Sequence, residues 1–355
     1  MRMSLVCPVL LAATLFATVQ ACAAPAPKPF YRLKSTLVIP SANAPNWDYL
    51  TYDSARDVLY VARREDGILI YDVNAKKIRG TIADTEGGNA TTLVPELDRG
   101  FVTNLDGSLT VFQLSSLKTL RRFKVGENAD NSFYEPVTRQ LFMTMGDSRR
   151  GMFVDAVSGK VTGQIDFESE KLEGAAPDGQ GNLFLALRDR DEIVRIDART
   201  RKVTATWKAE GCVLPNGVAY DSRYERVLVT CRGEKPIVAV LDAATGRVVA
   251  RPFIGRGNDV IIFDPDTRWI YTSNGFDGTL VVLQQDDADT YHLVEALTTR
   301  PYARTMALNP KTKEVYLVAA EGMVDPSKPW KSDIAPFYPN VYVKDTFTLL
   351  TYATN

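Results

Sequence analysis

Seven charged or amide residues recur along the chain at nearly constant intervals, and side chains of these types bind cations and polar ligands. They are four carboxylates, two amides and one guanidinium: Asp48, Asn89, Asp130, Glu173, Asn216, Asp259 and Arg304. The intervals between them are 41, 41, 43, 43, 43 and 45 residues. A fixed interval indicates structurally equivalent positions in a repeat protein. We therefore expect the seven side chains, together with the neighbouring Trp47, to form one ligand-binding site.

The seven side chains would carry a net charge of −3 if they met. Two carboxylates ~6 Å apart repel each other by roughly 3 kcal/mol at an effective dielectric constant of ~20. A raised pKa, the Arg304 guanidinium or a bound cation could relieve this repulsion. Hard divalent cations prefer carboxylate and amide oxygens, and Glu173, Asn216 and Asp259 come from three successive repeats. These three residues are the candidate metal ligands, with calcium as the candidate ion and no other cofactor expected.

Two other interpretations of these residues stay open. The side chains could simply cap strand ends and bind water in a channel. Alternatively, a bound metal could activate water for attack on a lactone carbonyl, with Asp259 or Glu173 as ligand or base.

The single histidine, His292, excludes several kinds of chemistry. A Ser-His-Asp triad, a zinc or copper site with several histidines and bis-histidine haem ligation all need histidines that this chain lacks. The 42 basic and 43 acidic residues nearly balance, with 24% charged and 45% hydrophobic residues. This is the composition of an ordinary globular protein, whereas a nucleic-acid-binding protein is usually basic. We therefore expect no nucleic-acid partner.

The repeat length fits a unit of four short strands, as in a β-propeller blade. Five positions after the recurring residues come Asp53, Val94, Glu135, Asp178, Asp221, Asp264 and Asn309, and all except Val94 favour turns. Each repeat then contains short β-branched and aromatic runs, such as residues 58–61 and 227–229, without helical periodicity. The sequence therefore predicts an all-β, seven-bladed β-propeller with four antiparallel strands per blade. It forms one domain over residues 30–355, and the recurring residues ring one mouth of its channel.

The two ends of this domain are predicted to meet in the last blade. Residues 347–352 form its third strand, and residues 31–39 supply its missing outer strand. This arrangement closes the ring and removes the strand edges that an open ring would expose.

The N-terminal residues have the pattern of an export signal. Arg2 is followed by an apolar stretch over residues 5–19 and by the small-residue sequence Ala21-Cys22-Ala23. The sequence predicts a signal peptide over residues 1–23, a proline-rich spacer over residues 24–29, and a periplasmic or secreted protein. Lipoprotein anchoring at Cys22 is the less favoured alternative. The apolar stretch is too short for a comfortable membrane span, so no transmembrane segment is expected.

Cys212 and Cys231 remain as an isolated pair after removal of the signal. In an oxidising compartment such a pair favours a disulfide. Cys212 precedes the first strand of the fifth repeat and Cys231 ends the second, so antiparallel pairing can bring the two residues within bonding reach.

Residues 321–341 interrupt the last repeat. This segment contains four prolines together with Trp330, Phe337 and Tyr338. Long loops without strands of their own are often functional in compact domains. Its topological position places it on the face of the ringed mouth, so we expect a partial lid whose aromatic side chains pack against the surface below.

Several segments resemble the YVTN-repeat family of exported YncE-like propellers. Residues 100–104 (Gly-Phe-Val-Thr-Asn), followed by residues 106–111 (Asp-Gly-Ser-Leu-Thr-Val), are similar to the YVTN signature. Residues 47–50, 271–275 and 303–308 also resemble segments of this family. The resemblance covers about residues 31–352 and implies a seven-bladed, exported propeller. Relatives often have a histidine at the repeat position equivalent to Asn89 or Ala90. The absence of a histidine there argues against histidine chemistry in this chain.

The resemblance also brings two possible functions. Some YncE-like relatives bind single-stranded DNA, a function that an acidic mouth disfavours. The Glu/Asn/Asp set is similar in residue type to the metal ligands of gluconolactonase-like propellers. The favoured function is a non-enzymatic, monomeric binding or scaffold protein for a small polar ligand, cation or partner protein. A divalent-metal-dependent, lactonase-like hydrolase is the alternative.

Overall fold

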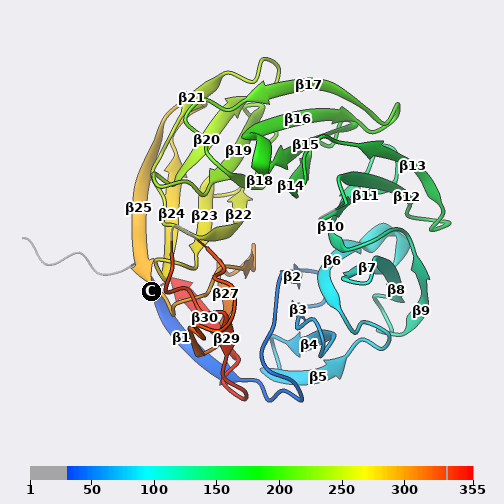
Figure 1. Ribbon diagram of the computed structural model, residues 1–355, viewed down its shortest axis with the longest axis vertical. Helices are drawn as coiled ribbons and strands as arrows, with labels where there is room; N and C mark the ends of the chain where they lie inside the picture. Colours follow the sequence, from blue (N-terminus) through cyan, green and yellow to red (C-terminus); the bar gives the residue numbers. More distant parts are fainter. Residues whose placement is uncertain (1–29, 147, 333–334, 355) are drawn as a thin grey trace, which may run out of the picture.

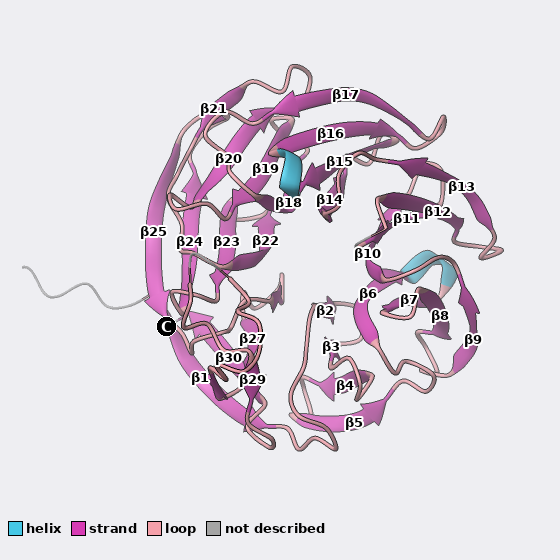
Figure 2. Ribbon diagram, in the orientation of Figure 1, coloured by secondary structure: helices cyan, strands magenta, loops and turns pink. Residues whose placement is uncertain are grey.

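A computed structural model describes residues 30–146, 148–332 and 335–354. The predicted signal peptide (1–23) and spacer (24–29) lie outside the described residues. Within the described ranges, no helix is long and apolar enough to cross a membrane. Seven four-stranded antiparallel sheets are arranged in a ring about a central axis (Figure 1), and strands dominate the secondary structure (Figure 2). The predicted seven-bladed β-propeller is confirmed.

Blades 1 to 6 each run in chain order from an inner to an outer strand. Blade 1 contains β2 (Leu50–Asp53), β3 (Val58–Ala62), β4 (Ile68–Asp72) and β5 (Lys77–Thr81). Blade 2 contains β6 (Gly88–Val94), β7 (Arg99–Asn104), β8 (Ser108–Gln113) and β9 (Thr119–Lys124). Blade 3 contains β10 (Ala129–Glu135), β11 (Gln140–Met145), β12 (Arg150–Asp155) and β13 (Val161–Asp166).

The next three blades follow the same order. Blade 4 contains β14 (Leu172–Pro177), β15 (Asn182–Leu187), β16 (Glu192–Asp197) and β17 (Lys202–Lys208). Blade 5 contains β18 (Pro215–Asp221), β19 (Arg226–Cys231), β20 (Ile237–Asp242) and β21 (Val248–Ala250). Blade 6 contains β22 (Asn258–Asp264), β23 (Trp269–Asn274), β24 (Thr279–Gln285) and β25 (Tyr291–Thr298).

Blade 7 joins the two ends of the propeller, as predicted. Its first three strands are β26 (Met306–Leu308), β27 (Val315–Ala319) and β30 (Thr348–Thr354), and its outer strand is β1 (Tyr31–Val38). β1 pairs antiparallel with β30, from Tyr31 opposite Thr354 to Val38 opposite Thr348. The insertion between β27 and β30 contains a small hairpin of β28 (Gly322–Met323) and β29 (Val341–Tyr342).

The core lies between the faces of neighbouring blades. β3 is buried along its whole length, whereas the outer strand β5 is exposed along its whole length. Leu59 and Val61 of blade 1 belong to the same buried cluster as Tyr316 and Val318 of blade 7. Burying one such aliphatic side chain stabilises the fold by about 1.5–3 kcal/mol. This packing between blades holds the inner loops in place around the channel.

The turns after the inner strands show why acidic residues recur there. Asp53 Oδ1 accepts hydrogen bonds from the backbone amides of Ala55 at 3.0 Å and Arg56 at 3.2 Å. Blade 2 has Val94 at this position, which offers no such acceptor. A short 3₁₀ helix, η1 (Pro95–Leu97), makes the turn there and ends at Asp98, whose φ of 53° is left-handed.

Candidate functional site

A cavity of about 480 Å³ lies at one mouth of the channel, lined by the starts of the inner strands, the loops around them and part of the blade 7 insertion. Six of the eight residues predicted to bind a ligand line it: Trp47, Asp48, Asp130, Glu173, Asp259 and Arg304. The other two are amides buried behind the wall. Asn89 Nδ2 donates to Asp130 Oδ1 at 2.6 Å, and Asn216 Nδ2 donates to the Asp259 carbonyl oxygen at 3.2 Å. The two amides therefore hold the lining carboxylates in place.

A second set of repeating positions also lines the cavity, and our sequence analysis missed it. Each member follows the second strand of its blade: Arg64, Leu105, Gly146, Arg188, Arg232 and Phe276. The intervals are 41, 41, 42, 44 and 44 residues. Arg188 opens the short helix η2 (Arg188–Arg190), which directly follows β15. Only three of the six positions are arginines, so residue type does not mark this set in the sequence as it marks the carboxylates.

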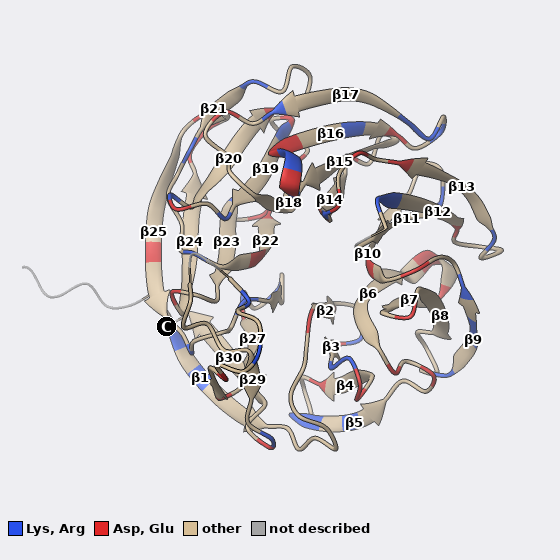
Figure 3. Cartoon of the chain, viewed as in Figure 1, with Lys and Arg blue, Asp and Glu red and all other residues tan. Residues whose placement is uncertain are grey.

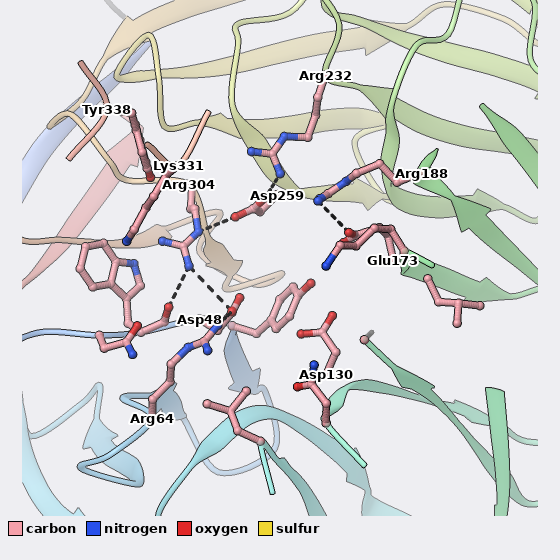
Figure 4. A pocket seen from close by; sticks show the side chains of 18 of the residues that line it. Asp48, Arg64, Asp130, Glu173, Arg188, Arg232, Asp259, Arg304, Lys331 and Tyr338 are labelled. Carbon is pink, nitrogen blue, oxygen red and sulfur yellow. Dashed lines mark hydrogen bonds and ion pairs between the residues drawn. The ribbon is translucent and has the colours of Figure 1, made fainter. Parts of the chain in front are cut away.

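The arginines overturn the expected acidic charge of the channel mouth. Four carboxylates line the cavity, but so do four arginines and two lysines: Arg64, Arg188, Arg232, Arg304, Lys171 and Lys331. Figure 3 shows basic and acidic residues interspersed around the ring, and Figure 4 shows them facing one another inside the cavity. The seven recurring residues do sum to −3, but the inference of an acidic mouth was wrong because it left out the basic residues that other positions contribute to the lining.

Guanidinium groups relieve the repulsion between the carboxylates. Asp259 pairs with Arg232 at 2.7 Å and with Arg304 at 2.5 Å. Asp48 pairs with Arg64 at 2.5 Å and lies 3.7 Å from Arg304. These paired groups come from blades 5, 6, 7 and 1, so this part of the cavity wall is a continuous ion-pair network (Figure 4).

The same network involves the residues predicted to bind calcium. Glu173 Oε1 lies 2.8 Å from Arg188 Nη1. The Asn216 side-chain oxygen accepts hydrogen bonds from Arg188 and, at 3.4 Å, from Arg232. In the described ranges, no group of three or more histidine, cysteine, aspartate or glutamate residues has the arrangement of a metal site. Guanidinium donors therefore face the oxygens to which a calcium ion would have to bind.

The carboxyl groups differ in their tendency to ionise. Burial raises the pKa of Glu173 to about 7, although Arg188 opposes this shift. Burial also raises the pKa of Asp130 well above its usual range, and the charges of Asp48 and Glu173 add to the effect. Burial alone would raise the pKa of Asp259 as well, but Arg232 and Arg304 hold it below the usual value. At neutral pH the basic side chains of the lining therefore outnumber the ionised carboxylates.

The insertion contributes to the cavity from blade 7. Lys331 and Tyr338, as well as Tyr342 in β29, line the cavity. The Tyr338 ring packs 4.5 Å from Phe276 and 5.0 Å from Tyr302, measured between ring centroids. Trp330 and Phe337 instead remain 55% and 80% exposed. Only one of the three aromatic residues expected to pack below the insertion therefore does so.

The predicted disulfide is confirmed. Cys212 and Cys231 are bonded at 2.04 Å, with their Cα atoms 5.2 Å apart. Cys231 ends β19, directly before Arg232. The disulfide thus fixes the chain at the point where an arginine enters the cavity.

Comparison with known proteins supports the fold alone. The sequence matches no protein family and no curated relative. A chain in the crystal structure of the mitotic checkpoint complex is similar in structure, with a TM-score of 0.72 at 14% identity, over 98% of this chain and 99% of that one. A chain of the Kuenenia stuttgartiensis hydrazine synthase has a TM-score of 0.66 at 16% identity, over 79% of this chain and 94% of that one. At these identities the likeness shows a shared propeller architecture.

Proposed function

We propose that this propeller is a binding protein that takes a small polar ligand into the cavity at its channel mouth. The observation that carries the proposal is the cavity itself, which loops of several blades enclose with ordered charged side chains. Its volume of about 480 Å³ falls within the roughly 300–1,000 Å³ of small-molecule sites. Charges held in place by ion pairs lose little freedom when a ligand binds, and this preorganisation favours affinity.

Binding is a better account of the cavity than hydrolysis. No serine, cysteine or histidine occurs among the described lining residues. His292 lies on the outer strand β25, where Nδ1 contacts Asp286 Oδ2 at 2.6 Å, and it is exposed. The oxygen atoms that a lactonase-like metal site would use already bind guanidinium groups. A lactone-hydrolysis assay of purified protein, with and without added calcium, should therefore show no turnover above background.

We propose that the protein acts outside the cytoplasm and belongs with the exported YncE-like propellers. The Cys212–Cys231 disulfide supports this location because structural disulfides persist in oxidising compartments. Mass spectrometry of the exported protein provides the test. Cleavage after Ala23 should leave Ala24 as the first residue, whereas a lipoprotein would begin with an acylated Cys22.

The cavity can be tested by filling it. Leu105 is a partly exposed lining residue of blade 2 without a charge. Leu105→Trp should abolish the thermal stabilisation given by any compound that binds in the cavity. Leu120→Trp, on the exposed outer strand β9, is the matched control. Ligand-induced shifts in melting temperature that survive Leu105→Trp would place binding elsewhere and contradict the proposal. A partner protein on the outer surface would give this result.

A further inference from the structure

Three basic side chains lie together where the insertion meets blades 7 and 1. Figure 4 shows Lys331 reaching from the insertion towards Arg304, with Arg64 on the other side of Asp48. Lys331 is exposed at the edge of the cavity. Partial loss of hydration lowers the pKa of its ammonium group, and the positive charges of Arg304 and Arg64 lower it further. Asp48 pairs with both arginines, and Asp259 pairs with Arg304 but is shared with Arg232. In the part of the chain that the structure describes, no carboxylate pairs with Lys331. The group thus has an excess of positive charge.

Hydrogen-bond donors in the same part of the cavity lack acceptors. Trp47 is only 1% exposed, yet its indole Nε1 has no partner among the described residues, and neither has Nε of Arg64. The Trp47 ring lies 5.4 Å from the Arg304 guanidinium carbon and 4.7 Å from the Tyr342 ring. Lys331 Nζ lies 4.9 Å from the centre of that tyrosine ring. Excess positive charge and unused donors therefore occur in one place.

A buried donor without an acceptor costs about 1–3 kcal/mol, and an ammonium beside two guanidinium groups adds charge repulsion. A group that is negatively charged and accepts several hydrogen bonds would relieve both. We propose, building on the proposed binding function, that the ligand is a small molecule bearing an oxyanion, either a carboxylate or a phosphate. Lys331, Arg304 and Arg64 bind this group, with Trp47 Nε1 as a further donor. A cationic ligand would meet three like charges here.

The test measures the binding of three probes to the purified protein by calorimetry. Succinate and inorganic phosphate carry the two kinds of oxyanion, and glucose is a neutral polar control. Lys331→Met should weaken the binding of at least one anion by about tenfold or more and leave glucose unaffected. Lys328→Met is the matched control, because this lysine is exposed on the same insertion and outside the cavity lining. It should change anion affinity by less than about twofold. Lys331→Arg, which keeps the charge, should restore most of the affinity.

Comparing succinate with phosphate distinguishes a carboxylate ligand from a phosphate ligand. A planar carboxylate matches a guanidinium through two parallel hydrogen bonds, whereas a phosphate offers a tetrahedral set of acceptors. Whichever anion loses more affinity in Lys331→Met identifies the group that the ligand carries. Melting temperatures of all variants in the absence of ligand confirm that they are folded.

Failure of this inference can be told from failure of the proposed function. One outcome would overturn the oxyanion assignment alone. In it, Leu105→Trp weakens glucose binding, but Lys331→Met does not weaken the binding of either anion. An equal loss of anion affinity in Lys331→Met and Lys328→Met would overturn it too, because the effect would then be general charge attraction. The oxyanion assignment and the proposed binding function would both be overturned if Leu105→Trp changed the affinity of no probe. They would also both be overturned if no probe bound at concentrations up to about 10 mM.

Discussion

Arg304 of blade 7 donates from Nε to Asp259 Oδ2 of blade 6 at 2.5 Å, and this pair joins the last two blades at the channel. The same guanidinium donates from Nη2 to the backbone oxygen of Trp47, ahead of blade 1, at 2.8 Å. Asp259 in turn binds Arg232 of blade 5. The β1–β30 pairing closes the ring between blades 7 and 1 at the rim, and the contact of Arg304 with Trp47 joins the same two blades at the channel. The residues that shape the cavity are thus also residues that hold the ring together.

Replacement of Arg304 should therefore be costly. Arg304→Met leaves Asp259 with one cationic partner and leaves Asp48 with Arg64 alone. Removing the sole partner of a buried charge costs about 3–5 kcal/mol. Because Asp259 keeps Arg232 and Asp48 keeps Arg64, the expected loss of stability for Arg304→Met is about 1–3 kcal/mol. Urea unfolding should show this loss, and adding Asp259→Asn should recover part of it. Arg251→Met is the control, since Arg251 pairs with the highly exposed Glu210 and should change stability by less than about 0.5 kcal/mol. A small effect for Arg304→Met would contradict a role in closure.

Glu173 should make stability depend on pH. Burial raises its pKa from the ordinary value of 4.5 to about 7 in the folded protein, so the folded state binds more protons than the unfolded state between these values. The folded protein consequently loses stability as pH rises from about 4.5 to 7. The neighbouring charges are Arg188, Asp259, Arg232 and Asp48.

Glu173→Gln removes this titration. The variant should melt about 2 °C or more above the wild type at pH 8, with the difference shrinking towards pH 4.5. Glu210→Gln, at an exposed position, should not change the pH profile. A Glu173→Gln protein that is less stable at pH 8 would show that the Arg188 contact outweighs the cost of burying the charge.

The sequence was sufficient to predict the fold because a propeller repeats the same local rules. A turn-favouring residue such as Asp53 ends or directly follows nearly every inner strand. Its side chain makes the same hydrogen bonds to the turn in several blades. The closing strand could be predicted because six complete blades left one strand missing from the seventh. The exception, Val94, shows how local chemistry compensates, since a proline-initiated 3₁₀ turn replaces the side-chain acceptor.

The charge of the site could not be predicted from one set of repeating positions. Arg64, Arg188 and Arg232 recur with the same period, but the equivalent positions in other blades are Leu105, Gly146 and Phe276. A set with such mixed chemistry gives no signal on its own. Whether an arginine at a strand end turns inward depends on a carboxylate from another loop, as with Arg232 and Asp259. Such a pairing depends on the three-dimensional arrangement of the blades.

The Cys212–Cys231 disulfide should stabilise blade 5. It closes a loop with a sequence separation of 19 residues, and the entropy of loop closure corresponds to about 3 kcal/mol. Cys212→Ala/Cys231→Ala should lower the free energy of unfolding by about this amount, while circular dichroism still shows a β protein. The wild type in reducing agent should unfold at the same denaturant concentration as the double variant. Equal stability of the oxidised wild type and the double variant would contradict the prediction.

The insertion should control how fast ligands leave the cavity. Replacing residues 326–339 by a short Gly-Asn turn removes Lys331 and Tyr338 from the lining but keeps the β28–β29 hairpin. Because Tyr338 packs on Phe276 and Tyr302, the segment rests on the wall and must move when a ligand passes. The dissociation rate of a bound ligand, measured by stopped flow, should rise about tenfold or more.

Lys331→Met is the control for the charge that the truncation removes. The part of the rate increase that comes from the lost charge should shrink as salt is added, whereas the part that comes from uncovering the cavity should not. Trp330→Ser/Phe337→Ser changes the exposed aromatic pair of the same segment and should leave the rate unchanged. If the truncated protein folds and releases the ligand no faster than Lys331→Met does, the insertion contributes a charge to the site and does not act as a lid.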